Sequence, residues 1–374
     1  MDRRQFIVGT AGAAGSLILP GSRAFAQAAS GLPDYYPAEY AEIVEASKAE
    51  NQLLCYSNIS IDMWSGVMQR FNQLYPWIEV QTLDLESSEV MERYLAEVGT
   101  GSQTGDFMLT FAPDAWIDLH ERGEIMDYRS AEHEQMPDWS IPYPGLYTCA
   151  IDPLLFVWNK ALLPEDMVPT SFADFVAKAK ANPEVFQDKT TTYGAQFGSF
   201  GYTANYAFIE KHGDQGWEWL QTVGPMTRVE RSSGPMLEKV TTGEYVFAFF
   251  CGSGNVFLAM NDPARAQLIG WSFISDGTPM LMRGAAVPKA STNVNSAKLM
   301  LDVVLSREGQ IAFSKGGRTP FRPDVTQEDI GGAYTYDAII AEIGEESAIP
   351  VRYNPQMIED FNAFMEKWRA AYGI

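Results

Sequence analysis

The sequence has few of the residues and motifs that build metal centres and covalent active sites. It contains three cysteines and three histidines in 374 residues, and neither a CxxC nor an HExxH pattern occurs, which leaves little for a zinc site. Neither a GxSxG motif nor a glycine-rich dinucleotide signature in a strand–turn–helix context is found. These absences argue against the common metal-dependent, nucleophilic and dinucleotide-dependent enzymes.

The odd number of cysteines leaves at least one thiol free, even in an oxidising compartment. All three lie within apolar, strand-like runs, so we expect buried structural thiols rather than a disulfide. The cysteines are Cys55, Cys149 and Cys251.

Basic residues are in short supply. The chain has 27 Lys and Arg against 48 Asp and Glu, a formal net charge of −21. Nucleic acid and anionic lipid both need clustered basic side chains, so the composition disfavours a partner of either kind. A small anionic ligand remains compatible with this charge, because a pocket can be locally positive.

The N-terminus lacks an apolar run long enough for a membrane-spanning helix, which needs about 18 residues or more. It carries Arg3-Arg4 before Phe6, then an uncharged Gly/Ala-rich run to Leu19 and the small-x-small sequence Ala24-Phe25-Ala26. This order is typical of a twin-arginine export signal. We therefore expect residues 1–26 to be a signal peptide that is cleaved after Ala26, and the mature protein to be periplasmic.

Removal of this segment would leave 374 − 26 = 348 residues with a net charge of −21 − 2 = −23, because the segment holds three arginines and one aspartate. A chain of this length exceeds what a single hydrophobic core usually covers. Two lobes are therefore the expected organisation of the mature protein.

Apolar periodicity alternates between strand and helix along the first part of the mature chain. Such a β-α-β-α order predicts an α/β fold in which each lobe is a doubly wound, mostly parallel sheet with helices on both faces. The expected strands are 52–56, 78–83 and 107–111, and the expected helices are 61–75, 87–98 and 115–121.

Two strand-like segments, 145–151 and 154–158, are separated only by Asp152-Pro153. Because proline interrupts the hydrogen bonding of a sheet, we expect the chain to cross between the lobes here. A second lobe follows, with a strand at 193–197, and a linked strand pair at 268–273 and 279–287 carries the chain back. The expected lobe 1 comprises 27–148 and about 285–330, and the expected lobe 2 comprises 149–284 and about 331–374. Two such crossings allow the lobes to hinge shut on a ligand.

A buried strand runs into a glycine turn within 245–257. Aromatic and small apolar residues lead into Gly252-Ser253-Gly254-Asn255, and an apolar-periodic segment continues to residue 261 as a helix. Such a turn aims backbone N–H groups and the positive end of a helix at whatever lies in front of it. The stretch is compatible with an anion-binding cradle and with an ordinary βα turn.

Five short motifs occur along the chain in a recognisable order and spacing. They are Ser57-Asn58 after the first strand, Gly105-Asp106-Phe107, Val157-Trp158-Asn159-Lys160, Thr242-Gly243-Glu244, and the stretch from Arg318 to Val325. In this order they resemble the periplasmic solute-binding proteins of ABC importers (extracellular solute-binding protein family 1), specifically the group related to ferric-iron-binding proteins. The resemblance spans essentially the whole mature chain. It implies a two-lobed periplasmic-binding-protein fold, a ligand between the lobes, delivery to a membrane permease, and no catalysis.

The resemblance also implies where iron-binding members hold their metal: a His after the first strand, a Glu after the third, and a Tyr pair after a strand of the second lobe. These positions fall near Ser60, Phe111 and Gly252-Ser253-Gly254, so the ligands for a hard cation are missing. Ferric iron needs several anionic oxygens, and we expect no bound metal and no cofactor. The resemblance also implies that the anion site of those relatives corresponds to residues 199–202 and Ser233 of this chain, which retain hydroxyls and glycines.

Candidate ligand-binding residues follow from these positions. Hydroxyls and N–H groups at converging helix starts suit a carboxylate or phosphate. An arginine at the returning crossing can bind either group through two hydrogen bonds, and aromatic rings can stack on an organic group. A helix cap, a surface arginine or a core ring is the alternative role at these positions. The candidates are Ser57, Asn58, Phe111, Asp114, Tyr147, Ser199, Tyr202, Ser233, Gly252, Ser253, Asn255 and Arg283.

These features together predict a soluble, monomeric substrate-binding component of an ABC importer. It would capture a small organic anion, either a carboxylate or a phosphorylated compound, and deliver it to a permease in the inner membrane. Ferric iron held through a synergistic anion is the first alternative, and an exported enzyme is the second.

The predicted signal peptide can be tested on the exported protein. N-terminal sequencing of the periplasmic form is expected to begin at Gln27, because the small-x-small site ends at Ala26. A mature protein that still begins at Met1 would contradict this prediction.

Overall fold

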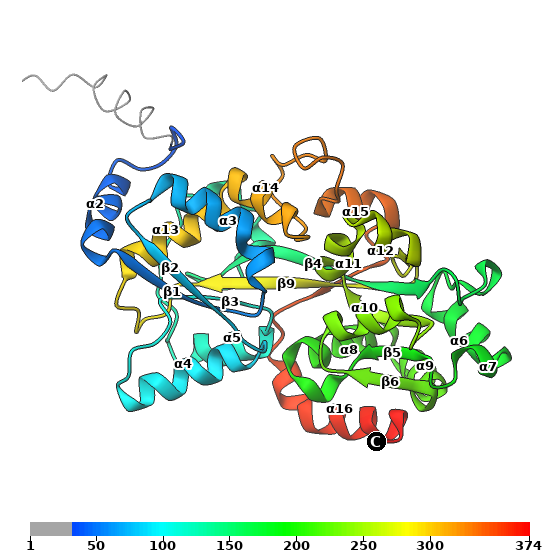
Figure 1. Ribbon diagram of the computed structural model, residues 1–374. Coiled ribbons are helices and arrows are strands. Elements are labelled where there is room, and N and C mark those ends of the chain that lie inside the picture. The colour runs from blue at the N-terminus through cyan, green and yellow to red at the C-terminus, as the bar shows by residue number, and fades with distance from the viewer. Residues whose placement is uncertain (1–31) are drawn as a thin grey trace, which may run out of the picture.

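A computed structural model describes residues 32–374 of the chain. The expected signal peptide, residues 1–26, lies outside the described residues. The described chain forms two lobes side by side, joined by long strands that run through both (Figure 1). Within residues 32–374, no helix is both long enough and apolar enough to cross a membrane.

One curled sheet connects the lobes, with its strands in the order β2-β1-β3-β9-β4-β7-β5-β6, while β10 pairs with β9 and β8 with β4. Strands toward the two ends of this order pair in parallel, and those that involve β4 pair in antiparallel fashion. The strands are β1 Gln52–Ser57, β2 Glu79–Asp84, β3 Phe107–Thr110, β4 Tyr147–Asn159, β5 Thr190–Tyr193, β6 Thr227–Glu230, β7 Phe247–Gly252, β8 Ile269–Ser272, β9 Thr278–Ala286 and β10 Ala348–Val351.

Helices flank the β1–β3 part of the sheet on both faces (Figure 1), as the strand–helix alternation predicted. Helix α3 shows the cause, because Trp64, Val67 and Phe71 recur at helical spacing and are all buried. Two helices from late in the chain return to this lobe, where α13 packs on α2 and α14 packs on α3. The helices are α2 Tyr40–Glu50, α3 Ile61–Leu74, α4 Glu89–Thr100, α5 Pro113–Glu121, α13 Val294–Leu305 and α14 Arg307–Lys315.

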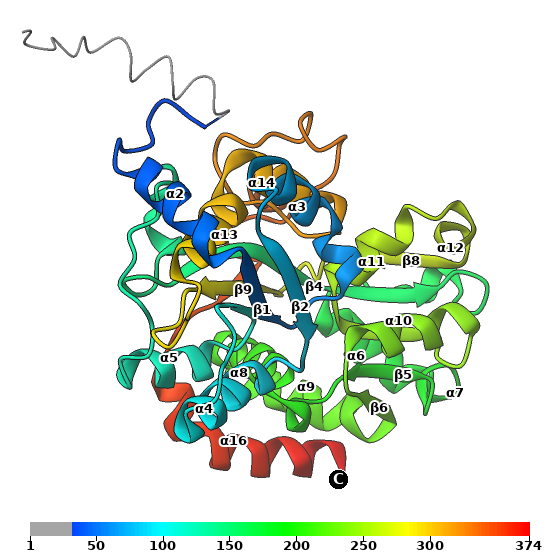
Figure 2. The same ribbon diagram turned by 60° about the vertical axis from the view of Figure 1, so that its left-hand side comes forward.

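The other lobe surrounds β5, β6 and β7 with helices and holds a dense aromatic core centred on Phe172. Its lower side is covered by the C-terminal helix α16, which packs on α8 and α9 (Figures 1 and 2). The indole Nε1 of Trp368 in α16 donates to Asn205 Oδ1 of α8 at 3.2 Å. The helices are α6 Phe172–Ala181, α7 Pro183–Phe186, α8 Ser199–His212, α9 Asp214–Val223, α10 Ser233–Thr242, α11 Ser253–Met260, α12 Pro263–Leu268, α15 Tyr336–Ile343 and α16 Gln356–Tyr372.

The crossing strand β4 is continuous, whereas the sequence predicted an interruption at Pro153. β4 spans 13 residues and pairs with β9 from Tyr147 to Pro153. The N–H of Ile151 points away from β9 and donates to Thr319 O at 3.1 Å. N–H groups alternate in direction along a strand, so the N–H that Pro153 lacks would face the same edge. The ladder with β7 begins on that edge only at Leu154, and the proline therefore removes no ladder bond.

Two further strand predictions were wrong in detail. The segments 268–273 and 279–287 do not pair with each other, because β4 is long enough for β8 to pair with its end at Phe156–Asn159 while β9 pairs with its beginning. The strand expected at 193–197 is β5, which ends at Tyr193. Its threonines are fully buried and β-branched, and Thr191 Oγ1 donates to Arg228 O at 2.8 Å. Hydrogen bonding of a hydroxyl to the backbone, together with the β-branched side chain, allows a residue such as Thr191 to lie in a buried strand.

The three cysteines are buried and free, which confirms the prediction made from the apolar runs around them. Burial raises the pKa of the Cys251 thiol to about 12 and that of Cys149 to about 12. These thiols are therefore protonated at neutral pH and behave as small apolar groups of the core.

A buried carboxylate of α13 fixes the segment 128–131, which follows α5 in lobe 1. Asp302 accepts hydrogen bonds from Ser130 Oγ at 2.5 Å, Tyr128 Oη at 2.7 Å and Ala131 N at 3.2 Å. Burial raises the pKa of Asp302 to about 7, and these hydrogen bonds only partly oppose the effect of burial. The folded protein therefore holds a proton on Asp302 that the unfolded chain has already released at pH 5 to 6.

We expect Asp302→Asn to flatten part of the pH dependence of stability. The pKa of Asp302 rises from 3.8 to about 7 on folding, so its protonation favours the folded state below pH 4 and this contribution declines as pH rises to 7, by up to about 1.4 kcal/mol per pH unit. The unfolding free energy of the variant minus that of the native protein should therefore increase from pH 5 to 7 and then level off. Urea unfolding at each pH measures it, and a difference that stays constant from pH 5 to 8 would contradict the assignment.

Candidate functional site

A cavity of about 270 Å³ lies between the lobes. It opens beyond the C-terminal ends of β1, β2, β5 and β7, which is where open α/β sheets bind their ligands. Both lobes and both crossing strands contribute to its lining. The lining residues are Asn58, Ile59, Ser60, Met63, Asp84, Leu85, Glu86, Asp152, Tyr193, Phe200, Ser232, Ser233, Gly234, Gly252, Gly254, Asn255, Arg283 and Arg318.

Two buried arginines meet at one carboxylate beneath this cavity. Asp152 of β4 accepts from Arg283 Nη2 at 2.6 Å and Nε at 3.1 Å, and from Arg318 Nη1 at 2.5 Å. Asp152, Arg283 and Arg318 are 1%, 2% and 7% exposed, respectively. Arg283 Nη1 also donates to Asn58 Oδ1, which ties the loop after β1 to the crossing strands. We call Asp152, Arg283 and Arg318 the arginine cluster.

The arginine cluster carries one positive charge in excess. Burial raises the pKa of Asp152, but the charges of Arg318 and Arg283 outweigh burial and leave this pKa below its usual value. Burial lowers the pKa of Arg318, and the repulsion from Arg283 adds to this effect. Arg318 Nε is buried without a hydrogen-bond partner among the described residues. An anion in the cavity would therefore meet an uncompensated guanidinium in surroundings that screen charge weakly.

Two helices begin at the cavity. Ser233 is the first residue of α10 and Ser253 is the first residue of α11. The hydroxyl of Ser233 accepts from Gly252 N at 2.9 Å, so the two helix starts are joined at this point. The N-terminal N–H groups of a helix and its dipole favour an anion, and here they approach the arginine cluster from the second lobe.

The glycine turn has a steric purpose that the sequence did not reveal. A Cβ at Gly254 would lie 2.8 Å from both Cζ and Nη1 of Arg318. Gly317, with φ at +78°, lies against the carbonyl of Gly254 at a distance that leaves no room for a side chain. Glycine at residue 254 therefore allows the guanidinium of Arg318, which Asp152 holds in place, to lie close to the backbone of the turn.

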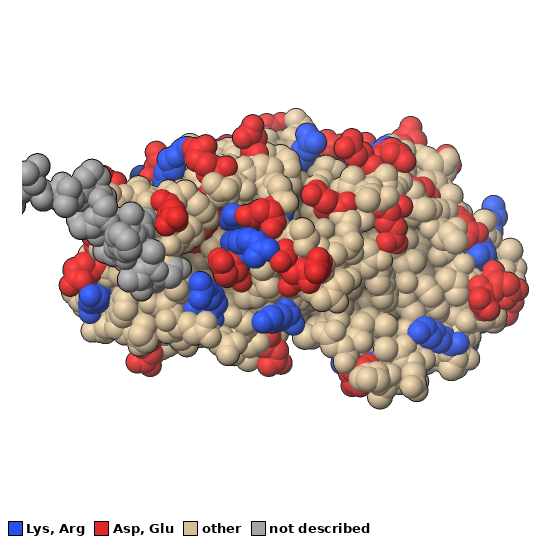
Figure 3. Space-filling model, turned by 90° about the horizontal axis from the view of Figure 1, so that it is seen from above, with Lys and Arg blue, Asp and Glu red and all other residues tan. Residues whose placement is uncertain are grey.

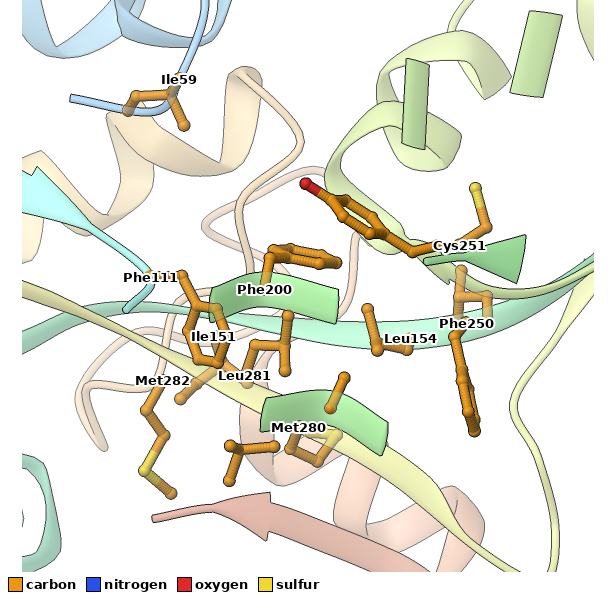
Figure 4. Packing of buried hydrophobic residues seen from close by; sticks show 14 of the residues in the cluster. Ile59, Phe111, Ile151, Leu154, Phe200, Phe250, Cys251, Met280, Leu281 and Met282 are labelled. Atoms are coloured by element: carbon orange, nitrogen blue, oxygen red, sulfur yellow. The ribbon is translucent and has the colours of Figure 1, made fainter. Parts of the chain in front are cut away.

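A bulge directs the end of β7 toward the cavity. The register between β4 and β7 shifts between Leu155 and Val157, and Phe250 adopts the left-handed conformation with φ at 57°. Its side chain is fully buried, and Cys251 follows it at the end of the strand (Figure 4). An extra residue in one strand bends that strand locally, and this bend brings Gly252 to the cavity edge.

Direct contacts already join the lobes beside the cavity. Ser88 Oγ lies 3.1 Å from Ser199 Oγ and accepts from Ser199 N at 3.2 Å. Phe111, just after β3, packs edge-on against Phe200 of α8 with ring centroids 5.6 Å apart (Figure 4). Of these four residues, only Phe200 lines the cavity. The predicted residues Ser199 and Phe111 therefore form an interlobe contact beside it.

Five of the predicted residues line the cavity, namely Asn58, Ser233, Gly252, Asn255 and Arg283. Ser253 is fully buried behind them, and its hydroxyl has no partner in the described chain. Asp114 lies in the first turn of α5, where burial raises its pKa while a hydrogen bond from Ser199 opposes the rise.

The other predicted residues have structural partners away from the lining. Ser57 accepts from the indole of Trp64 at 2.9 Å. Tyr147 Oη accepts from Ser130 N at 3.0 Å on the far side of lobe 1. The phenol of Tyr202 donates to the backbone of α16 and its ring packs on Phe364.

Sequence reasoning missed several lining residues. Arg318 was noted only as part of a motif, and Asp152 only as the residue before the proline that separates two strand-like segments. Asp84 and Glu86 follow directly after the second predicted strand, and Tyr193 ends β5. Their position at the C-terminal ends of strands was the available signal.

Residues 66–341 match the sequence model of a family described as bacterial extracellular solute-binding protein. This match spans well over half of the chain. The chain belongs to the bacterial extracellular solute-binding proteins. The resemblance drawn from the short motifs is thereby confirmed. No significant match is found for this solute-binding protein among curated proteins.

Solved structures of the same fold cover most of the chain. A substrate-binding protein of an ABC transporter from Agrobacterium tumefaciens has a TM-score of 0.77 and 21% identity, covering 86% of this chain and 94% of its own. AfuA from Actinobacillus pleuropneumoniae, with fructose-6-phosphate bound, has a TM-score of 0.68 and 18% identity, covering 86% and 99%. Iron-bound HitA from Pseudomonas aeruginosa has a TM-score of 0.68 and 14% identity, also covering 86% and 99%. At these identities the similarity shows the fold, which is the two-lobed periplasmic-binding-protein fold.

The three positions at which the family resemblance placed iron ligands do not all lie in the cavity. Ser60 and the backbone of Gly252 and Gly254 line the cavity, whereas Phe111 is buried against Phe200. Within residues 32–374, no group of three or more His, Cys, Asp and Glu side chains is arranged to hold a metal ion.

We expect Asp152→Asn to lower the free energy of unfolding by about 3–5 kcal/mol, because it leaves two buried guanidiniums without their shared counter-charge. Urea unfolding at pH 7 measures the loss. Asp324→Asn is the matched control, since Asp324 pairs with the buried Arg322 but its side chain is 47% exposed, and such a pair contributes at most about 1 kcal/mol. Equal losses in the two variants would contradict the role given to Asp152.

Proposed function

We propose that this solute-binding protein is the soluble receptor of an ABC importer and captures a small organic anion, a carboxylate or a phosphorylated compound, between its lobes. The observation that carries the proposal is the arginine cluster, in which two buried guanidiniums share one carboxylate beneath the cavity. The starts of α10 and α11 add backbone N–H groups directed at the same space. A permease in the inner membrane would receive the ligand.

Each predicted lining residue has a role in this proposal. Arg283 and Arg318 attract the anion, and Ser233 with the backbone at Gly252 orients it. Asn58 holds Arg283 from the first lobe, and Asn255, in the first turn of α11, offers an amide. Ser199, Phe111, Asp114 and Ser253 would support the walls, and Ser57, Tyr147 and Tyr202 the surrounding structure. The fructose-6-phosphate bound to AfuA is an anion of the proposed class.

Capture would involve movement of the lobes relative to each other. We assign 27–148 with about 285–330 to lobe 1, and 149–284 with about 331–374 to lobe 2, so that β4 and β9 carry the chain through the hinge. Closure would exclude water from the arginine cluster and strengthen its attraction for the anion. The surface is acidic overall, and on the face that Figure 3 shows the basic side chains are scattered among acidic and uncharged ones. Such a surface would disfavour binding of polyanions outside the cavity. We further propose that the protein acts as a monomer in the periplasm after twin-arginine export.

Two alternative functions can be distinguished from this proposal by experiment. Ferric iron held through a synergistic anion is favoured by the fold shared with iron-bound HitA, and it predicts a coloured protein that gains thermal stability with ferric citrate. An exported enzyme would turn its ligand over, whereas a receptor binds one equivalent and leaves the ligand unchanged.

A thermal-shift panel of carboxylates, phosphorylated sugars, amines and ferric complexes tests the function. A ligand that binds only the folded state at 100 times its Kd adds about 2.7 kcal/mol to stability, so an organic anion should raise the melting temperature by several degrees. If ferric citrate alone has this effect, the iron alternative holds. If no anion has it, the proposal fails.

We expect Ser233→Asp to reduce the affinity for the anion found in this panel at least 100-fold, because it places a like charge where the anion binds. Calorimetric titration measures the affinity, and circular dichroism checks the fold. Thr335→Asp is the control, since Thr335 caps α15 by accepting from Ala338 N at 3.2 Å and aspartate is an equally good cap. Undiminished affinity in a folded Ser233→Asp protein would remove α10 from the site.

A further inference from the structure

One wall of the cavity is acidic. Asp84 is the last residue of β2, and Glu86 follows two residues later. Both carboxylates line the cavity and stay accessible to solvent at its mouth, and neither has an ion-pair partner in the described part of the chain. We call this pair the acidic wall. Its two carboxylates are not used by the anion site proposed above.

The charges of the cavity lining do not suit a simple anion. Two guanidiniums and three carboxylates line it, so their formal sum is 2 − 3 = −1. The excess positive charge lies in the arginine cluster, and the two unpaired negative charges lie on the acidic wall. An anion bound at the arginine cluster without a compensating group would face both carboxylates of the wall. Such a like-charge arrangement selects against that ligand.

The acidic wall is itself short of positive charge. Burial raises the pKa of Asp84, and the charges of Arg283 and Arg318 only partly oppose this. Partial burial also raises the pKa of Glu86, as do its acidic neighbours Glu89 and Asp84, and the charge of Arg231 opposes this only in part. A cation between the carboxylates would stabilise the ionised form of each. A hydroxyl group would donate one hydrogen bond but would leave their mutual repulsion in place.

We propose that the natural ligand is an organic anion that also carries an ammonium group, with the anionic end on the arginine cluster and the ammonium between Asp84 and Glu86. This inference rests on the proposed function, because it assumes the anion site. The cavity volume of about 270 Å³ lies just below the usual range of ligand pockets, which is about 300–1,000 Å³. The ligand is therefore a compact molecule in which the two charges are held a short distance apart.

Matched compounds separate the inference from the function on which it rests. The pairs are 4-aminobutyrate with butyrate, 2-aminoethyl phosphate with ethyl phosphate, and glucosamine 6-phosphate with glucose 6-phosphate. Each pair differs by an amine at a comparable size and anionic group. Calorimetric titration at pH 7 is expected to show at least a tenfold preference for the amine-bearing member in at least one pair.

The variants Asp84→Asn and Glu86→Gln locate the preference. Each should weaken binding of the preferred amine at least tenfold, and should leave the affinity for its amine-free partner unchanged or increased. Glu79→Gln, at the exposed start of β2, is the matched control and should change neither affinity. Because both wall residues are accessible to solvent and unpaired, their neutral variants are expected to fold normally.

Three outcomes overturn the inference. They are equal affinity within every pair that binds, a preference for the amine-free members, and no binding by any pair. In each case the proposed function stands if another organic anion from the thermal-shift panel binds, and it fails if none does. An amine preference that persists in both Asp84→Asn and Glu86→Gln would also overturn the assignment of the ammonium to the acidic wall.

Discussion

The ion pairing of Asp152 is the interaction on which the rest of the site depends. Its carboxylate lies where β4 crosses between the lobes, and its partners come from β9 and from the loop after α14. Three segments far apart in sequence therefore converge on one buried negative charge. The cost of desolvating these ions is offset because each guanidinium pairs with its own carboxylate oxygen of Asp152. The ligand cavity is consequently built over the crossing itself. Because the two guanidiniums carry one more charge than the carboxylate of Asp152, the crossing has an excess positive charge that favours an anion.

Each lobe contributes a different part of the site around the arginine cluster. The second lobe supplies the starts of α10 and α11, and the first lobe supplies Asn58 and the acidic wall. A ligand that spans the arginine cluster and the wall would contact both lobes at once. It would stabilise the closed arrangement by the difference between its affinities for the closed and open forms. The direct contacts Ser88–Ser199 and Phe111–Phe200 beside the cavity show that the lobes also have an affinity of their own.

Apolar periodicity predicted the α/β architecture and most elements, because buried faces leave a clear pattern in sequence. It misplaced β5, since three threonines look polar although their β-branched side chains suit a buried strand. Within the site, the sequence located the glycine turn correctly but did not explain why the turn contains Gly254. The explanation is the close approach of Gly254 to Arg318, which is far away in sequence. Tyr147 and Tyr202 could not be distinguished from cavity residues, since core and pocket aromatics have the same composition. Asp84 and Glu86 resembled an ordinary solvated loop, and only the fold brings them opposite two arginines.

The unbroken course of β4 determines how the lobes can move. A loop hinge would allow them to swing freely, but a continuous strand paired with β9 transmits torsion from one lobe to the other. The register of β4 shifts at two places on either side of Pro153, between Thr148 and Ala150 and between Leu155 and Val157. Twist concentrates at such irregularities, because the ladder is locally interrupted there. In the proposed closure, twisting of β4 would be concentrated on either side of Asp152, the residue that holds the two arginines in place.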